Sequence, residues 1–295
     1  MDRLPPDTRI GAVHLTVADL CQMTAFYRDV LGFRPATDRP APTSEPREGG
    51  SASRQVVGFS ATGAAPYDLV LHQAEPAASP RRAAGLYHFA VLLPTRVDLA
   101  RALRHLIDVQ APIEGASDHA VSEAVYLHDP EGNGIELYAD RPRERWPART
   151  GRLEMTTKPL DVDDLFRSGS GRWEQLPAGT RIGHMHLRVN DLGRAETFYA
   201  GTLGFEVTVR GYPGALFVAA GGYHHHVGLN TWAGPLPPAQ PGGLGLRYFT
   251  LVLPDPAARE AVLSRARAAD IHPQTGEEGG ALLRDPDGIG VMLTN

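Results

Sequence analysis

The sequence predicts an α+β fold in which four βαβββ units pair into two cup-shaped sheets. Three observations predict it. The first is an internal repeat, because the pattern of residues 10–20 recurs at residues 182–192. The second is a weaker repeat of residues 86–94 at 246–254, and the third is an Asp-Pro-x-Gly element near the end of each half. Internal repetition of this kind makes each copy one structural unit.

The first unit of each half follows one pattern. A strand is predicted at residues 13–17 and again at 185–189. Asp19 and Asp191 follow, in a position where a side-chain oxygen caps the next helix. Gly32 and Gly204 stand where that helix ends, since glycine accepts the left-handed conformation found there. Shorter strands are predicted afterwards, at residues 56–59, 68–71, 216–219 and 227–229.

The second unit of each half repeats the pattern more loosely. Strands at residues 86–93 and 246–253 are followed by helices predicted at 97–109 and 257–269. Each unit then closes on the Asp-Pro-x-Gly element, which is typical of a tight turn between two strands.

These boundaries predict two domains joined by a linker. The N-terminal domain spans residues 8–139, with units 8–75 and 84–139, and is expected to be the active one. Residues 140–180 form the linker. The C-terminal domain spans residues 181–295, with units 181–232 and 243–295, and is expected to be degenerate. A mobile loop is predicted at residues 40–53, which are rich in Pro, Gly, Ser and charge and offer little to bury.

The composition excludes several classes of protein. The net charge of −5 over 295 residues gives no basic footprint for nucleic acid. The lone Cys21 excludes an internal disulfide and a cysteine-rich zinc site. No apolar run is long enough to span a membrane, and the N-terminus lacks a signal-peptide pattern. We therefore expect a cytoplasmic protein that binds neither nucleic acid nor membrane.

Strand parity suggests a metal site. In residues 13–17 the apolar side chains share one face, so His14 points to the other. His88 is the titratable residue of an apolar strand, and Glu136 alternates with Ile135 and Leu137. Two imidazoles and one carboxylate form the facial triad typical of non-haem Fe(II) sites. A single strand histidine is more often structural, so the prediction of His14, His88 and Glu136 as ligands depends on the whole set. Fe(II) is the expected metal, with Mn(II), Zn(II) or another divalent ion as alternatives.

The repeated units, these ligand positions and the Asp-Pro-x-Gly-x-x-x-Glu ending resemble the vicinal oxygen chelate superfamily of glyoxalases, bleomycin-resistance proteins and extradiol dioxygenases. The resemblance covers nearly the whole chain and is strongest to the two-domain catechol 2,3-dioxygenase-like branch. Residues 85–94 and 118–127 are its most specific parts.

The resemblance implies roles for further residues. Tyr126, ten residues before Glu136, corresponds to a tyrosine that hydrogen-bonds the bound catechol, or else is a core tyrosine. His119 is the nearest match to a histidine that stabilises the substrate or the oxygenated intermediate, although its spacing is short. The family's acid–base histidine has no clear counterpart, and His72 is the candidate. His72 is alternatively a fourth metal ligand, as in glyoxalase-type members.

The C-terminal half departs from the pattern. It keeps His186, but Tyr248 and Met292 stand at the other two ligand positions, and methionine is a poor ligand for a hard or borderline ion. A second site from His186 with His225 is possible, and His184, His224 and His226 are alternatives. Otherwise these histidines are structural.

The expected function is therefore extradiol cleavage of a catechol-type vicinal diol with O2. A glyoxalase-like lyase or isomerase is the first alternative, and a protein that sequesters an aromatic compound is the second. The resemblance also implies a homo-oligomer.

Overall fold

The computed structural model describes residues 3–36, 55–75, 82–149, 152–276 and 279–295. The loop predicted at residues 40–53 lies outside these ranges. In the described part of the chain no helix has the length and apolarity that a membrane crossing requires.

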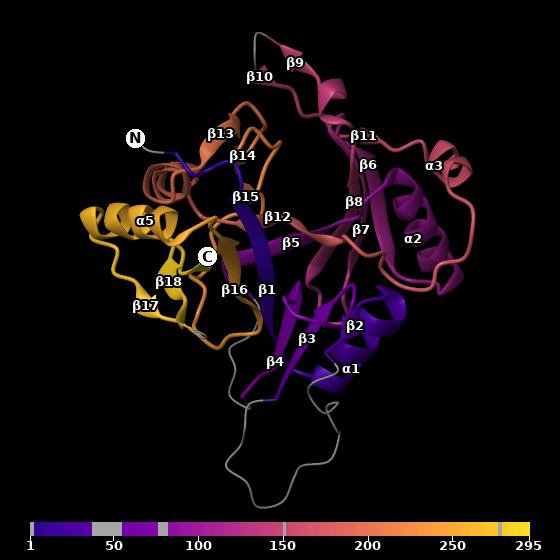
Figure 1. Ribbon diagram of the computed structural model, residues 1–295, viewed down its shortest axis with the longest axis horizontal. Helices are drawn as coiled ribbons and strands as arrows, with labels where there is room; N and C mark the ends of the chain where they lie inside the picture. Colours follow the sequence, from indigo (N-terminus) through magenta and orange to yellow (C-terminus); the bar gives the residue numbers. More distant parts are fainter. Residues whose placement is uncertain (1–2, 37–54, 76–81, 150–151, 277–278) are drawn as a thin grey trace, which may run out of the picture.

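All four predicted βαβββ units are present (Figure 1). The first contains β1 (Arg9–Val17), α1 (Leu20–Ala25) continued by a π-helical turn (Phe26–Val30), β2 (Arg34–Pro35), β3 (Val56–Ser60) and β4 (Leu69–Gln73). The second contains β5 (Gly85–Leu92), α2 (Arg96–Asp108), β6 (Ile113–Asp118), β7 (Ser122–His128) and β8 (Gly134–Asp140). The third contains β12 (Arg181–Arg188), α4 (Leu192–Glu196) with a π-helical turn (Thr197–Thr202), β13 (Glu206–Val209), β14 (Ala215–Ala219) and β15 (Val227–Asn230). The fourth contains β16 (Gly245–Val252), α5 (Pro256–Ala268), β17 (Gln274–Thr275), β18 (Ala281–Arg284) and β19 (Gly290–Thr294).

The local signals predicted from the sequence are confirmed. Asp19 caps α1 by accepting the Gln22 amide, and Asp191 caps α4 by accepting the Arg194 amide. Gly32 has φ +77° and Gly204 has φ +97°, the left-handed conformation expected after each helix.

Each sheet combines one unit from each half, and this corrects the predicted pairing of consecutive units. The first sheet has the strand order β17-β18-β19-β16-β1-β4-β3-β2, so the first unit joins the fourth. The second sheet has the order β11-β6-β7-β8-β5-β12-β15-β14-β13, so the second unit joins the third. The joining pairs, β1 with β16 and β5 with β12, are antiparallel. In an isolated unit, the first strand would leave one of its edges unpaired. In the structure this edge pairs with the first strand of a unit from the other half.

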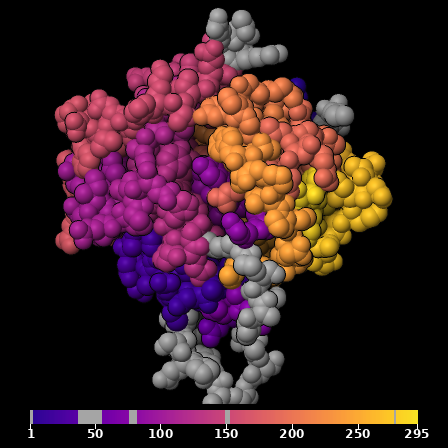
Figure 2. Space-filling view, turned by 180° about the vertical axis from the view of Figure 1, so that it is seen from behind, coloured from indigo at the N-terminus to yellow at the C-terminus, as the bar shows by residue number. Residues whose placement is uncertain are grey.

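The two units of one half contact each other away from the sheets. Tyr27 of the first unit donates its hydroxyl hydrogen bond to Asp129 of the second, at 2.7 Å. Tyr199 of the third unit does the same to Asp285 of the fourth, at 3.2 Å. Each half therefore occupies its own side of the molecule, with indigo and magenta on one side and orange and yellow on the other (Figure 2). The sheets cross the boundary between the halves.

The predicted linker packs onto the fold. It contains a 3-10 turn (Arg143–Arg145), β9 (Ala148–Arg149), β10 (Arg152–Leu153), β11 (Lys158–Pro159) and α3 (Val162–Ser168). Strand β11 pairs with β6 at the edge of the second sheet, and Leu160 and Leu165 are buried.

Side chains on the central strands alternate between the core and the cup. Phe89 and Val91 of β5 belong to the main hydrophobic core, as do Met185 and Leu187 of β12. His88 and Ala90, and likewise His184 and His186, therefore face the opposite side. The second sheet thus presents a row of polar groups inside its cup.

Candidate metal centre

Three side chains from three adjacent strands converge in the cup of the second sheet. They are His88 on β5, Glu136 on β8 and His184 on β12. His88 Nε2 lies 2.9 Å from Glu136 Oε2, and His184 Nε2 lies 3.2 Å from the same oxygen. The three ligand atoms lie within 4.8 Å of one another. Ala90 pairs in register with both Glu136 and His184, so its small side chain leaves the space between them open.

The spacing of these atoms fits a divalent ion. Two ligands bound at about 2.1 Å and at right angles have donor atoms about 3 Å apart. The three residues are 1–6 % exposed. Among the described residues, His88 Nε2 has no hydrogen-bond partner although a carboxylate oxygen lies beside it. Such close donor atoms without a hydrogen bond between them are expected of ligands that share one ion.

The charge of Glu136 is stabilised by the two imidazoles. Burial alone raises the pKa of this carboxyl, but His184 and His88 hold the pKa well below its usual range. Burial also lowers the pKa of His184, to about 4. An anionic Glu136 beside a neutral His184 is the state in which these two groups bind a metal.

The structure does not bring His14 to this centre, which corrects the predicted ligand set. His14 lies on β1 in the first sheet, where its ring stacks on Tyr248 and its Nδ1 lies 2.9 Å from His72 Nε2. In the repeat, His14 corresponds to His186, and the residue that corresponds to His184 is Ala12. Comparing the two copies position by position is the sequence signal that could have identified His184.

His72 likewise lies in the other sheet from the candidate metal centre. It lies on β4 of the first sheet, is 4 % exposed and contacts His14. The prediction of His72 as an acid–base group or fourth ligand of this centre is therefore wrong.

His186 and His225 do lie in the cup, but beside the first centre rather than at a second one. The His186 ring is 4.9 Å from that of His88, and the His225 ring is 4.0 Å from that of His184. Within the described chain, His186 Nε2 is buried and has no hydrogen-bond partner. The predicted separate pair of His186 and His225 thus forms part of the same cavity.

The structure brings Tyr126 and His119 together at the same cavity. The Tyr126 hydroxyl lies 2.5 Å from His119 Nε2, and His119 Nδ1 lies 2.9 Å from the Thr156 carbonyl. Since a carbonyl only accepts, Nδ1 carries the hydrogen, and a neutral His119 accepts the Tyr126 hydrogen at Nε2. Burial, followed by the charge of Glu136, raises the pKa of Tyr126 well above its usual range.

A cavity of about 350 Å³ opens above these groups. Its floor holds the three candidate ligands, and its walls include several aromatic rings: Tyr87, Tyr212, Phe217 and Trp232. Tyr87 and Trp232 are 36 % and 46 % exposed and form the rim. An apolar cavity with a few convergent polar groups is typical of a small-molecule site.

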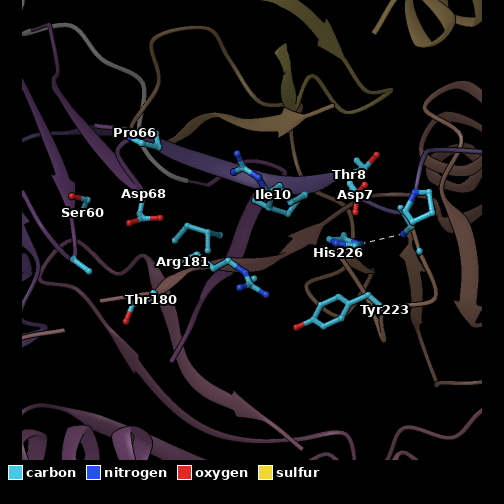
Figure 3. Close-up of a pocket in the computed structure, with 18 of the residues that line it drawn as sticks. Asp7, Thr8, Ile10, Ser60, Pro66, Asp68, Thr180, Arg181, Tyr223 and His226 are labelled. Atoms are coloured by element: carbon cyan, nitrogen blue, oxygen red, sulfur yellow. Dashed lines mark hydrogen bonds between the residues drawn. The ribbon is translucent and has the colours of Figure 1, made fainter. Parts of the chain in front are cut away.

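A larger cavity of about 680 Å³ lies between the two sheets (Figure 3). Asp68 and Tyr223 lie on opposite sides of it. Of the described residues, the group suited to a metal lines the smaller cavity and not this one. We therefore place the candidate chemistry in the smaller cavity.

Comparisons with known proteins agree with this architecture. The profile of the Glyoxalase/Bleomycin resistance protein/Dioxygenase superfamily matches residues 9–137 and 181–293. The catechol-2,3-dioxygenase of Bacillus subtilis (strain 168) is 43 % identical over 279 residues, which cover 91 % of each chain.

Solved structures show the same fold. A putative dioxygenase from Bacillus subtilis matches with a TM-score of 0.63 and 13 % identity, covering 99 % of this chain and 86 % of that one. Glyoxalase I from Zea mays matches with a TM-score of 0.56 and 16 % identity, covering 97 % and 92 %. The chain thus belongs to the glyoxalase, bleomycin-resistance and dioxygenase superfamily.

Proposed function

We propose that this protein is a metal-dependent extradiol dioxygenase that cleaves the ring of a catechol-type diol with O2. The observation that carries the proposal is the three-residue centre of His88, Glu136 and His184 on the floor of an aromatic-lined cavity. Three protein ligands leave positions open for a diol and for O2. The 43 % identity to a catechol-2,3-dioxygenase supports the same activity.

Fe(II) is the proposed metal, and Mn(II) fits the same donor set. When bound, the ion would stabilise the oxyanions of a chelated diol and hold diol and O2 next to each other. The side chains around the ion would hydrogen-bond the substrate and transfer protons.

Tyr126 and His119 are proposed to hold one substrate oxygen. The Tyr126 hydrogen is donated to His119 Nε2, so the phenolic oxygen has lone pairs available to accept a hydrogen bond from a substrate hydroxyl. The His119–Thr156 contact fixes the ring that accepts the tyrosine hydrogen.

His225 is proposed as the acid–base group, in place of His72. It lines the cavity and is 6 % exposed, and its ring lies 4.0 Å from that of His184 at an angle of 47°. Burial lowers the pKa of His225 well below its usual range, so the ring is neutral and keeps one nitrogen lone pair unprotonated.

A second candidate function is favoured by His186. Its Nε2 is buried without a hydrogen-bond partner among the described residues, and its ring lies 4.9 Å from that of His88. A movement of this side chain would supply a fourth protein ligand, as expected of a glyoxalase-like lyase or isomerase that uses the metal as a Lewis acid. The cytoplasmic location and the homo-oligomeric state stay predictions from the sequence.

The test is O2 consumption with catechol after anaerobic loading of the protein with Fe(II). Wild type should consume O2 and form a yellow ring-fission product, whereas Glu136→Gln should lose both tight metal binding and activity. The matched control is His14→Ala, which removes a histidine from the other sheet. Stoichiometric metal without O2 uptake on several substituted catechols would favour the lyase or isomerase, and failure to retain metal would refute both.

A further inference from the structure

A hydrogen-bonded chain leads from Asp140 through His224 to His225. Asp140 Oδ1 lies 2.9 Å from His224 Nε2, and His224 Nδ1 lies 2.7 Å from His225 Nδ1. Asp140 is the last residue of β8 in the first half, whereas the two histidines precede β15 in the second half. His224 is fully buried, and the Asp140 side chain is 24 % exposed.

The direction of these hydrogen bonds is set by what each group can do. An ionised carboxylate only accepts, so His224 Nε2 carries a hydrogen. A neutral His224 then has a bare Nδ1, which accepts the Nδ1 hydrogen of His225. His225 is left with a bare Nε2, since its Nδ1 is the nitrogen that contacts His224, and the residue lines the cavity.

The carboxylate is itself held in place. The Tyr223 hydroxyl donates to Asp140 Oδ2 at 2.9 Å, and the hydroxyls of Tyr138 and Tyr223 lie 2.8 Å apart. Gly183 makes room for this contact, because a Cβ there would lie 1.7 Å from the Tyr138 hydroxyl. Tyr223 also lines the larger cavity, so the outer end of the chain borders that cavity (Figure 3).

The adjacent His226 is not part of the chain. Its Nδ1 accepts the backbone amide of Ala220 at 3.1 Å. The three consecutive histidines therefore have three different hydrogen-bond environments, and His225 is the one that lines the candidate active-site cavity.

We infer that Asp140 and His224 are positioning residues that fix the tautomer of His225, so that His225 presents the lone pair of Nε2 to the active-site cavity. The functional part of this inference rests on the proposed dioxygenase activity. There, a substrate O–H bond would break as an N–H bond forms at His225 Nε2, and His225 Nδ1 would keep its hydrogen and go on donating it to His224 Nδ1. The positive charge that develops on His225 would be stabilised by Asp140 through His224.

The first test reads the tautomer without turnover. The full-length chain is labelled with ¹⁵N-histidine and loaded with diamagnetic Zn(II), and long-range ¹H–¹⁵N correlation spectra are recorded. His225 is assigned by the signals lost in His225→Gln. Wild type should show His225 with Nδ1 protonated and Nε2 bare. Protonation at Nε2 instead would overturn the inference, as would a cationic His224.

Variants test the chain itself. His224→Leu removes the acceptor and should give mixed tautomers of His225, whereas His224→Asn keeps an acceptor at the δ position and should restore the wild-type tautomer. Asp140→Ala is a second variant for the case that His224→Leu does not fold. It is also expected to give mixed tautomers of His225. The matched control is Asp270→Ala, because Asp270 contacts His272 at 3.1 Å on the exposed surface. An unchanged His225 tautomer in both His224→Leu and Asp140→Ala would refute the inference.

Kinetics provide the second readout. With Fe(II) and catechol, His224→Leu should lower kcat by about 10- to 100-fold with little change in KM or metal content, and His224→Asn should recover most of the loss. If wild type itself does not cleave catechol, the proposed function fails while the tautomer result stands. If wild type is active and His224→Leu keeps full kcat, the positioning role is refuted alone.

Discussion

Replacing His184 with alanine should release the metal, whereas replacing His14 with alanine should leave it bound. His184 Nε2 lies 3.2 Å from the Glu136 oxygen that also faces His88, while His14 lies in the other sheet beside His72 and Tyr248. Four-ligand structural zinc sites bind with about 10–16 kcal/mol, or roughly 3 kcal/mol for each ligand. Loss of one of the three protein ligands should therefore weaken binding by on the order of 10²- to 10³-fold.

The assay is an anaerobic competition titration of Zn(II) or Fe(II) against a chromophoric chelator, with circular dichroism as a check on folding. The pair is matched, because both variants remove an imidazole from the first strand of a repeated unit. Equal metal affinity in His184→Ala and wild type would refute the assignment of His184, and loss of metal in His14→Ala alone would restore the original prediction.

Three further predictions concern the metal centre, the substrate cavity and the larger cavity between the sheets. Ala90→Leu places a larger side chain between Glu136 and His184. A metal titration should show weakened binding, and urea unfolding should show a free energy of unfolding lower by about 1–3 kcal/mol. Wild-type metal affinity in this variant would contradict the prediction. Tyr126→Phe should raise the KM for catechol about five- to tenfold, from loss of about 1 kcal/mol of hydrogen bonding, with the metal content unchanged; an unaltered KM would exclude Tyr126 from substrate binding. Asp68→Asn should stabilise the protein above pH 6, because burial raises the pKa of Asp68 to about 6 and the folded state then holds a costly charge. The change from the ordinary value of 3.8 corresponds to at most about 3 kcal/mol, lost by wild type as pH rises from about 4 to 6, so urea unfolding should show a gain at pH 8 that disappears near pH 4.

Local features of the fold were predictable because they depend on neighbouring residues. The helix caps at Asp19 and Asp191 and the glycines that end the helices lie where the sequence predicts them. Strand parity also placed His88 and Glu136 on one face, and the resemblance to extradiol dioxygenases pointed to Tyr126, which pairs with Glu136 across β7 and β8.

The partner of each unit was not predictable in the same way. The first strands of the four units have similar apolar patterns, and each has an open edge that any of the others can cover. The sequence therefore does not say whether β5 pairs with β1 or with β12. That one choice decides whether His14 or His184 meets Glu136. The role of His224 was not predictable for the same reason, because its partner Asp140 comes from the other half of the sequence.

Because each sheet contains strands from both halves of the chain, a metal bound in the second sheet would connect the two halves. His88 and Glu136 belong to the first half and His184 to the second, so an ion held by all three would tie the halves together. Any ligand that binds only the assembled state adds to its stability, by about 2.7 kcal/mol at a concentration 100 times its Kd. Each half expressed alone would carry an incomplete ligand set, and two separate halves would recover metal affinity only by reassembling. Metal binding and the association of the two halves are therefore thermodynamically coupled.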